Sequence, residues 1–265
     1  MMEHEYLEFA KSVAYEAGEV MRKYYGKKPS FRLKEDETIV TIADEEINEM
    51  VIKRVEHAYP AHGVDGEESS AKKDSKYLWV CDPIDGTALF AREVPFSMFS
   101  LALVIDGEPV LGVAYDPFHN KLFWAAQGEG AWLDDMPLQV SQAKLDNRSM
   151  VNVEASYAIS SDARMTLEKR GVLVTSMGSA VRTAVMVASG RMEAMIFGGT
   201  EGKNVDIAAV KVIVEESGGK VTDLNGKEQR YDGAINGAIV SNGMVHDEIV
   251  QYMQQQYEKE KSHEI

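Results

Sequence analysis

The chain has 265 residues, enough for one large domain or for two lobes that share a core. Hydrophobic residues make up 45% and charged residues 27%, and 43 acidic against 28 basic residues give a net charge of −15. This acidity argues against nucleic acid or an anionic membrane surface as a partner. A small phosphate-bearing ligand stays open, because bound cations can reverse the sign of one pocket.

The cellular compartment is predicted from what the sequence lacks. A single cysteine, Cys81, excludes an internal disulfide framework and suits a reducing compartment. The first ten residues, MMEHEYLEFA, have neither the basic start nor the apolar core of a signal peptide. No apolar run approaches the ~18 residues that a membrane span needs. We expect a soluble, cytoplasmic protein with no membrane partner.

Two helices and a strand are predicted first along the chain. Apolar residues at three- and four-residue spacing indicate helices over 3–25 and 44–58. The run YLWVC at 77–81 is typical of a short buried strand. Pro83 and Gly86 are expected to break regular structure after it.

A β-meander is predicted next. Asp106-Gly107 supplies the positive φ angles of a tight turn, so 98–115 should form a hairpin. The meander is expected to span about 97–126. The stretch GEGAW at 128–132 resembles a phosphate-binding loop only loosely, and a turn is favoured there.

The second half alternates short apolar runs with helical stretches, which indicates a sheet covered by helices. The runs are GVLVTS, EAMIF and GAIVSN, and the helical stretches lie near 180–189, 206–217 and 244–256. The polar stretch at 142–150 suggests a boundary between lobes. We therefore predict an α/β layered protein with an N-terminal lobe over 1–145 and a C-terminal lobe over 146–265.

Two carboxylates in the stretch WVCDPIDGTALF raise a chemical question. Asp82 and Asp85 follow a buried strand, where ligand sites gather in layered α/β folds. Two unit charges ~4 Å apart repel by about 4 kcal/mol at an effective dielectric near 20. A cation between them would offset this repulsion, and hard oxygen ligands without a His or Cys cluster favour Mg²⁺ or Mn²⁺. A Pro-Gly turn with polar corners is the alternative.

Other acidic residues carry two interpretations each. Asp44 and Asp206 stand where helices are expected to begin, and an Asp at that place is usually an N-cap. Glu67 and Glu68 lie in a glycine-flanked loop, where paired glutamates are usually only hydrated. The alternative for all four is that they join the carboxylates of the strand end in one site.

The ordered set of motifs resembles the inositol monophosphatase family. The motifs are GEES at 66–69, DPIDGT at 82–87 and the late Asp in VDIAAVKVIVEESGG at 205–219. The family belongs to a wider group of Mg²⁺-dependent, lithium-sensitive phosphatases that includes fructose-1,6-bisphosphatases. The likeness runs in the same order over almost the whole chain. It implies the α+β layered sandwich of that group, with alternating helix and sheet layers, and a homodimer.

The resemblance also implies the roles of individual residues. The implied catalytic residues are Glu67, Thr87 and Asp44: Glu67 and Thr87 would position and deprotonate the attacking water, and Asp44, together with Glu68, would support them. The implied metal ligands, for two or three Mg²⁺ ions or substituting Mn²⁺, are Glu67, Asp82, the backbone carbonyl of Ile84, Asp85 and Asp206. The implied substrate-binding residues are Asp85, Gly86, Thr87, Gly178, Ser179, Ala180 and Asp206.

Some positions depart from the family pattern on the substrate side. Val205 stands where members usually have Trp before the late Asp, and Phe197 stands near a Glu that binds substrate hydroxyls in inositol-specific members. Glu201 is a candidate replacement for that Glu. The metal-binding and phosphate-binding half of the pattern is intact.

The predicted function is Mg²⁺-dependent hydrolysis of a small polyol or sugar phosphate, of the inositol-1-phosphate type. Metal-activated water would attack directly, without a phospho-enzyme. Fructose-1,6-bisphosphatase and NADP(H) 2′-phosphatase activities are the alternatives within the family. The alternative from another class is a non-catalytic regulatory protein that binds a phosphate ligand.

Overall fold

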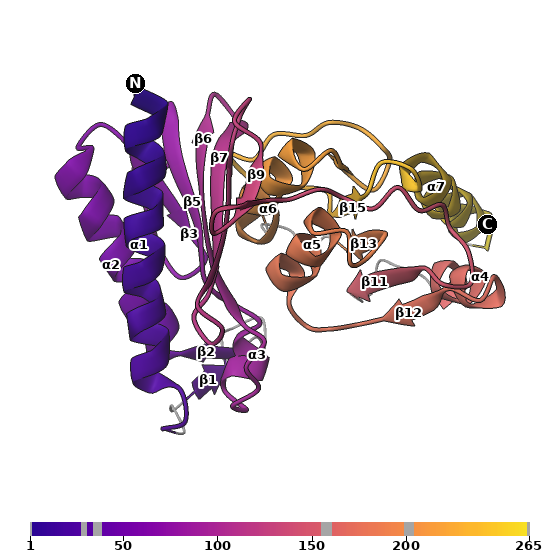
Figure 1. The fold of residues 1–265 in the computed structure, drawn as a ribbon, viewed down its shortest axis with the longest axis horizontal. Helices are drawn as coiled ribbons and strands as arrows, with labels where there is room; N and C mark the ends of the chain where they lie inside the picture. The colour runs from indigo at the N-terminus through magenta and orange to yellow at the C-terminus, as the bar shows by residue number, and fades with distance from the viewer. Residues whose placement is uncertain (1, 28–30, 34–38, 155–160, 199–203, 264–265) are drawn as a thin grey trace.

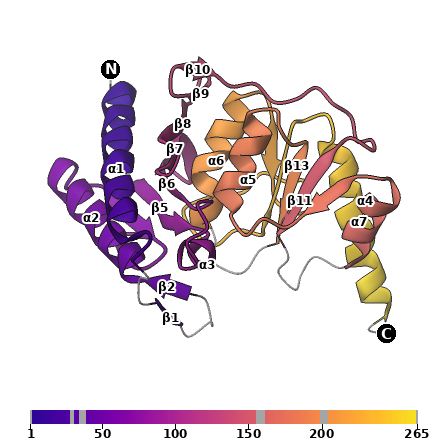
Figure 2. The same ribbon diagram turned by 60° about the horizontal axis from the view of Figure 1, so that its bottom comes forward.

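Helix layers and sheet layers alternate across the molecule. The computed structural model describes residues 2–27, 31–33, 39–154, 161–198 and 204–263. The helices in these ranges are α1 (Met2–Tyr24), α2 (Ile42–Ala58), α3 (Thr87–Phe90), α4 (Ser161–Lys169), α5 (Ala180–Ala188), α6 (Asn204–Glu216) and α7 (His246–His263). Figures 1 and 2 show α1 and α2 outside a first sheet, α5 and α6 between the two large sheets, and α4 and α7 outside the second. The predicted layered α/β sandwich is confirmed.

The first sheet is built almost entirely before residue 140. Its strands, in spatial order, are β10 (Met136–Pro137), β9 (Ala131–Leu133), β8 (Lys121–Ala126), β7 (Glu108–Asp116), β6 (Met98–Ile105), β5 (Tyr77–Asp85), β3 (Gly63–Gly66) and β4 (Ser70–Ala71). Only the β3–β5 pair among these neighbours is parallel. A separate small hairpin pairs β1 (Phe31–Leu33) with β2 (Ile39–Thr41).

The turn between β6 and β7 forms as predicted. Asp106 and Gly107 have φ angles of 53° and 89°, and Ile105 pairs with Glu108 across the turn. Two central residues with positive φ match the twist of the adjoining strands. The meander continues into β8, so this part of the prediction is confirmed.

The strand that carries the two aspartates is longer than predicted. β5 does not end at Cys81 but continues through Pro83 to Asp85. Its pairing with β6 shifts register between Asp82 and Asp85. Proline is tolerated at such a bulge because the missing amide hydrogen is not needed there. The expected break at Pro83 is wrong, and the bulge turns the carboxylates toward the middle of the molecule.

The second sheet lies in the later part of the chain. Its strands, in spatial order, are β12 (Leu173–Thr175), β11 (Met150–Glu154), β13 (Ala194–Phe197), β15 (Ala238–Ser241) and β14 (Lys220–Thr222). The apolar runs and the three later helices were predicted, but α4 was not. Helix α4 buries Ala163 and Leu167 against the sheet side and exposes much of the rest, so its apolar signal is weak.

The core between the sheets belongs to both halves of the chain. One buried cluster includes Val80 and Ala102 of the first sheet, Val212 of α6, and Met195 and Val240 of the second sheet. Helix α6 approaches β7 so closely that a Cβ on Gly112 would lie 2.2 Å from the Ala209 carbonyl oxygen. The predicted lobe boundary at 145/146 falls on the connection from β10 to β11 and stays a prediction. None of the helices in the described ranges combines the length and apolar character needed to cross a bilayer.

Candidate active site

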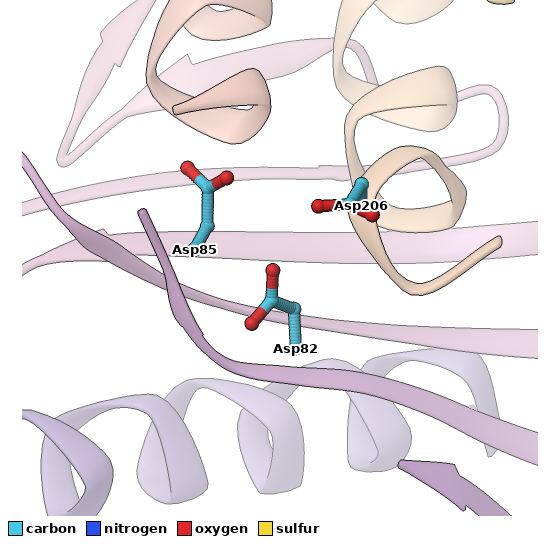
Figure 3. A group of neighbouring side chains, drawn as sticks. All are labelled: Asp82, Asp85 and Asp206. Carbon is cyan, nitrogen blue, oxygen red and sulfur yellow. The ribbon is translucent and has the colours of Figure 1, made fainter. Parts of the chain in front are cut away.

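Three carboxylates from distant parts of the chain meet between the two sheets. Asp82 and Asp85 come from the end of β5, and Asp206 comes from the first turn of α6. Each offers one oxygen atom, and these oxygens lie within 4.8 Å of one another. Figure 3 shows the three side chains directed toward a shared space. Asp82 and Asp85 are buried at 1% and 3% exposure, so water screens their repulsion poorly.

The Asp85 carboxylate is held by the N-terminus of α5. It accepts hydrogen bonds from the Ser179 hydroxyl and from the amides of Ala180 at 2.9 Å, Val181 at 3.1 Å and Arg182 at 3.4 Å. Burial raises the pKa of Asp85 to about 6, and these donors oppose that rise. The positive end of the helix dipole also favours the anion. The contact fixes the end of β5 to the second half of the chain.

The bulge also orients Asp82 and Ile84. The Ile84 amide donates to Asp82 Oδ1 at 3.0 Å, and the Ile84 carbonyl oxygen lies 3.0 Å from Thr87 Oγ1. Residues of the DPIDGT motif therefore hold one another within a single tight turn. The carbonyl that we expected to face a metal lies within reach of the hydroxyl that we expected to orient water.

Thr87 is aligned by Asp44. Thr87 Oγ1 lies 3.1 Å from Asp44 Oδ1, while the Thr41 amide and hydroxyl donate to Asp44 Oδ2 at 2.8 and 2.5 Å. Complete burial raises the pKa of Asp44 to about 7; the Thr41 bonds oppose the rise, and the negative charges of Glu68 and Glu67 add to it. The N-cap of α2 is Thr41, and Asp44 closes its capping box from the third helical position. The N-cap interpretation of Asp44 is therefore wrong.

Glu67 and Glu68 sit at the end of β3, beside the end of β5. The Glu67 amide donates to the Cys81 carbonyl at 3.1 Å, which extends the parallel pairing of the two strands. The Glu68 amide donates to Asn48 Oδ1 at 3.2 Å. Glu67 is not one of the three carboxylates that lie within 4.8 Å of one another. Both glutamates lie near enough to Asp44 for their negative charges to raise its pKa.

Gly86 lets the motif turn against the second half of the chain. It has φ of 81°, and a Cβ there would lie 3.0 Å from the Gly178 carbonyl oxygen and 3.3 Å from Ser179 Cβ. Ser97 Oγ donates to the Gly86 carbonyl at 2.9 Å. Gly178 and Ser179 of the GSA stretch thus lie against the DGT turn.

The expected turn forms over the first part of the stretch at 128–132: Gly128 and Gly130 have φ angles of 77° and 74°, and Ala131 already begins β9. The amides of Gly128 and Gly130 each donate to the Glu216 carboxylate at 2.9 Å. These donors are occupied by the C-terminal end of α6. The two bonds tie this loop to the C-terminal end of α6.

A glutamate lies next to Phe197, the position at which the sequence departs from the family pattern. Phe197 lies opposite Glu154 on the neighbouring strand. Glu154 Oε1 accepts from the Gly178 amide at 3.0 Å and from Asn152 Nδ2 at 2.7 Å. Glu201, the candidate replacement for the missing Glu, lies outside the described residues.

Asn48 was not singled out in the sequence, although it carries a signal. It is a buried polar residue one turn after Asp44, on the face of α2 that otherwise packs apolar side chains. Its side chain donates to the Ser69 carbonyl at 2.9 Å and accepts from Glu68. A polar residue at that spacing on an apolar helix face indicates that the helix holds a loop in place.

The donor set fits a hard divalent cation. The three converging groups are carboxylates, and neither His nor Cys joins them within the described residues. Oxygen-only sites suit Mg²⁺ and Mn²⁺, whereas Zn²⁺ sites usually include nitrogen or sulfur. Asp82, Asp85 and Asp206 are the side chains that could hold such an ion.

Comparison with known proteins agrees with the motifs. A model of the inositol monophosphatase family matches residues 2–258. The chain is 32% identical over 257 residues to the fructose-1,6-bisphosphatase/inositol-1-monophosphatase of Thermotoga maritima, covering 96% of this chain and 97% of that protein. It is 34% identical over 230 residues to Nus factor SuhB of Pasteurella multocida, covering 83% and 85%. The structure of the Thermotoga maritima IMPase superimposes with a TM-score of 0.86 at 29% identity, covering 96% of this chain and 99% of that one. The chain belongs to the inositol monophosphatase family of phosphatases.

Proposed function

We propose that this phosphatase hydrolyses small polyol or sugar phosphates with the help of Mg²⁺, by direct attack of water on phosphorus. The observation that carries the proposal is the approach of Asp82, Asp85 and Asp206 to within 4.8 Å of one another beside the Thr87–Asp44 pair. The chemistry that bound divalent cations supply is activation of a water molecule and stabilisation of the leaving oxygen.

Thr87 would orient the attacking water. Its hydroxyl has one hydrogen, and both groups near it, Asp44 Oδ1 and the Ile84 carbonyl, can accept that hydrogen. With the hydrogen so occupied, the lone pairs of Thr87 Oγ1 are left to accept a hydrogen bond from water. Glu67, at the end of the neighbouring strand, would take the proton that the water loses. In these roles water is the nucleophile, and no side chain is phosphorylated.

Phosphate would meet backbone amides at the DGT turn. Gly86 and Thr87 begin the short helix α3, where backbone amides favour negative charge. The alcohol would lie toward Gly178 and Ser179. Glu154, fixed by the Gly178 amide, is the described acidic side chain on that side and would accept hydrogen bonds from substrate hydroxyls.

The experiment is a phosphate-release assay on three esters: inositol 1-phosphate, fructose 1,6-bisphosphate and NADP⁺. Each is assayed with Mg²⁺, with EDTA, and with Mg²⁺ plus Li⁺. We expect Mg²⁺-dependent release that Li⁺ inhibits, with inositol 1-phosphate among the substrates. Preference for the bisphosphate would favour the second candidate, which the name of the Thermotoga maritima relative supports.

The same assay separates the enzyme from a regulatory protein. Absence of release from all three esters, together with phosphate-ester binding by calorimetry, would replace the proposal with the non-catalytic alternative. Asp82→Asn is the matched background control, because it removes a carboxylate of the site while keeping the shape of the side chain.

A further inference from the structure

A buried polar pair joins the strand before Glu67 to the helix that carries Asp206. Asn204 Nδ2 donates to Asp65 Oδ2 at 3.1 Å, across 139 positions of sequence. Asp65 is 5% exposed and Asn204 is 2% exposed. Neither residue carries a role in the function proposed above. The bond connects β3 directly to the first residue of α6.

Both amide hydrogens of Asn204 and both carboxylate oxygens of Asp65 are engaged. The second hydrogen of the Asn204 amide group is donated to the Tyr231 carbonyl at 2.9 Å. Asp65 Oδ1 accepts from Ser70 Oγ at 3.0 Å and from Lys73 Nζ at 2.6 Å. A buried carboxylate is costly unless it is paired and hydrogen-bonded, and here it is both. Removing one partner therefore leaves a buried polar group unsatisfied.

The position of the pair relates it to the site. Asp65 stands two residues before Glu67 on β3, and Asn204 stands two residues before Asp206 in the first turn of α6. Strand β3 is paired with β5, so Asp65 lies opposite Val80, two residues before Asp82. A shift of the first turn of α6 along or away from β3 would move Asp206 relative to Asp82. The Asp65–Asn204 bond opposes that shift.

We infer that Asp65 and Asn204 are positioning residues, which hold Asp206 at the distance from Asp82 and Asp85 that binding of a divalent cation needs. The inference rests on the proposed function, because it assumes that these three aspartates bind the metal. A hydrogen bond fixes both a distance and a direction, whereas apolar contact fixes neither as narrowly. The pair therefore sets the geometry of the site from a distance without touching the reacting atoms.

The test is Mn²⁺ binding measured by calorimetry on the full chain without substrate. The variants are Asn204→Ala, Asp65→Ala, the double variant, and the conservative Asp65→Asn, which keeps an oxygen acceptor for Asn204. Thermal unfolding without metal is measured for each. The matched control is Asp223→Ala, since Asp223 is a buried aspartate that accepts from the Asn225 and Lys227 amides after β14.

We expect Asn204→Ala and Asp65→Ala each to weaken Mn²⁺ binding roughly tenfold, the lower end of the effect of groups that orient metal ligands. The double variant should be no weaker than the worse single variant, because both remove the same bond. Asp65→Asn should stay within about twofold of the wild type, since the acceptor is kept. Asp223→Ala should lower the unfolding temperature without changing the affinity.

Two outcomes would overturn the inference. One is Mn²⁺ affinity in Asn204→Ala equal to that of the wild type. The other is a loss of affinity in every variant, Asp223→Ala included, that follows the loss of thermal stability, which would make the pair merely structural. If Asp65→Ala does not fold, Asn204→Ala decides alone, because it leaves Asp65 paired with Ser70 and Lys73. A wild-type chain that binds no Mn²⁺ would instead refute the proposed function.

Discussion

Gly86 and Gly178 are in such close contact that a Cβ on Gly86 would lie 3.0 Å from the Gly178 carbonyl oxygen. The two glycines belong to the DGT turn and to the GSA stretch, which are far apart in sequence. Gly86 also has a φ of 81°, which residues with a Cβ rarely adopt. Position 86 therefore requires a residue that accepts a positive φ angle and has no Cβ.

Gly86→Ala should lower turnover roughly 100-fold, because a displacement of about 1 Å near the reacting groups is enough for such a loss. The strain of the positive φ angle adds about 1–2 kcal/mol of destabilisation. The control is Gly26→Ala, since Gly26 has φ of 76° with nothing within 4 Å of its would-be Cβ. Phosphate release and thermal unfolding measure the two effects. Equal activity losses in both variants would show that backbone strain, not the contact with Gly178, is responsible.

Asp82→Asn should reduce turnover by more than roughly 100-fold, because a ligand matters more than the groups that orient it. The fold should persist, since the Asn oxygen can still accept from the Ile84 amide as Asp82 Oδ1 does. Without metal, the unfolding temperature should equal or exceed that of the wild type, because one of three crowded negative charges is gone. Full activity in this variant would mean that the metal assignment is incorrect. Circular dichroism and phosphate release provide the two measurements.

Thr87→Val should lower kcat by roughly 100-fold, in the range of groups that assist proton transfer. Valine keeps the branched shape but loses the oxygen that contacts Asp44. Thr87→Ser restores the hydroxyl and should recover most of kcat. Steady-state kinetics should show the loss in kcat with little change in KM. A raised KM with an unchanged kcat would assign Thr87 to substrate binding instead of water orientation.

His246 should make a destabilising contribution to the stability of the protein on mild acidification. This buried ring lies 2.9 Å from both Thr222 Oγ1 and Ser241 Oγ, and burial, with a smaller contribution from Lys220, lowers the pKa of His246 from 6.5 to about 4. Between these values the unfolded chain binds a proton that the folded chain does not. His246 should therefore contribute a loss of roughly 3 kcal/mol as pH falls from about 6.5 to about 4. Asp44 and Asp85, whose raised pKa values make the folded chain bind protons in this range, contribute in the opposite direction.

Denaturant unfolding at several pH values measures this dependence. The difference in stability between the wild type and His246→Gln should change by roughly 3 kcal/mol over this pH range, because glutamine cannot take up the proton. The control variant is His57→Gln, at an exposed position of α2. An equal pH dependence in the wild type and in His246→Gln would show that His246 does not contribute.

Local patterns in the sequence were sufficient where one residue type decides the structure. Asp106-Gly107 predicted a tight hairpin because few residues accept two successive positive φ angles. Apolar residues at three- and four-residue spacing predicted α1, and the structure buries Ala10, Val13 and Ala17 on one face of it. The convergence of Asp82, Asp85 and Asp206 came from the family resemblance, because spacing along the chain says nothing of distances between elements.

Features that depend on a partner far along the chain were not predicted. Pro83 was expected to end a strand, but its place in the bulge depends on the register of β6. Asp44 carried two interpretations, an N-cap or a member of the site, and its contact with Thr87, 43 positions later, is not visible in the local sequence. The bond between Asp65 and Asn204 was not predicted, since each alone is an ordinary polar residue at the end of an element. Tertiary contact decides these cases, and local sequence carries no record of it.

The hydrogen bonds from the N-terminus of α5 to Asp85 have a consequence for biosynthesis. The aspartate is translated almost a hundred residues before the amides of Ala180 and Val181 that stabilise its charge. A nascent or cleaved chain that stops short of α5 lacks these donors and also lacks Asp206, so we expect it to be unable to bind the cation. Activity should therefore arise only when the last third of the polypeptide has folded against the rest. Fragments that end before α5 should not hydrolyse an ester.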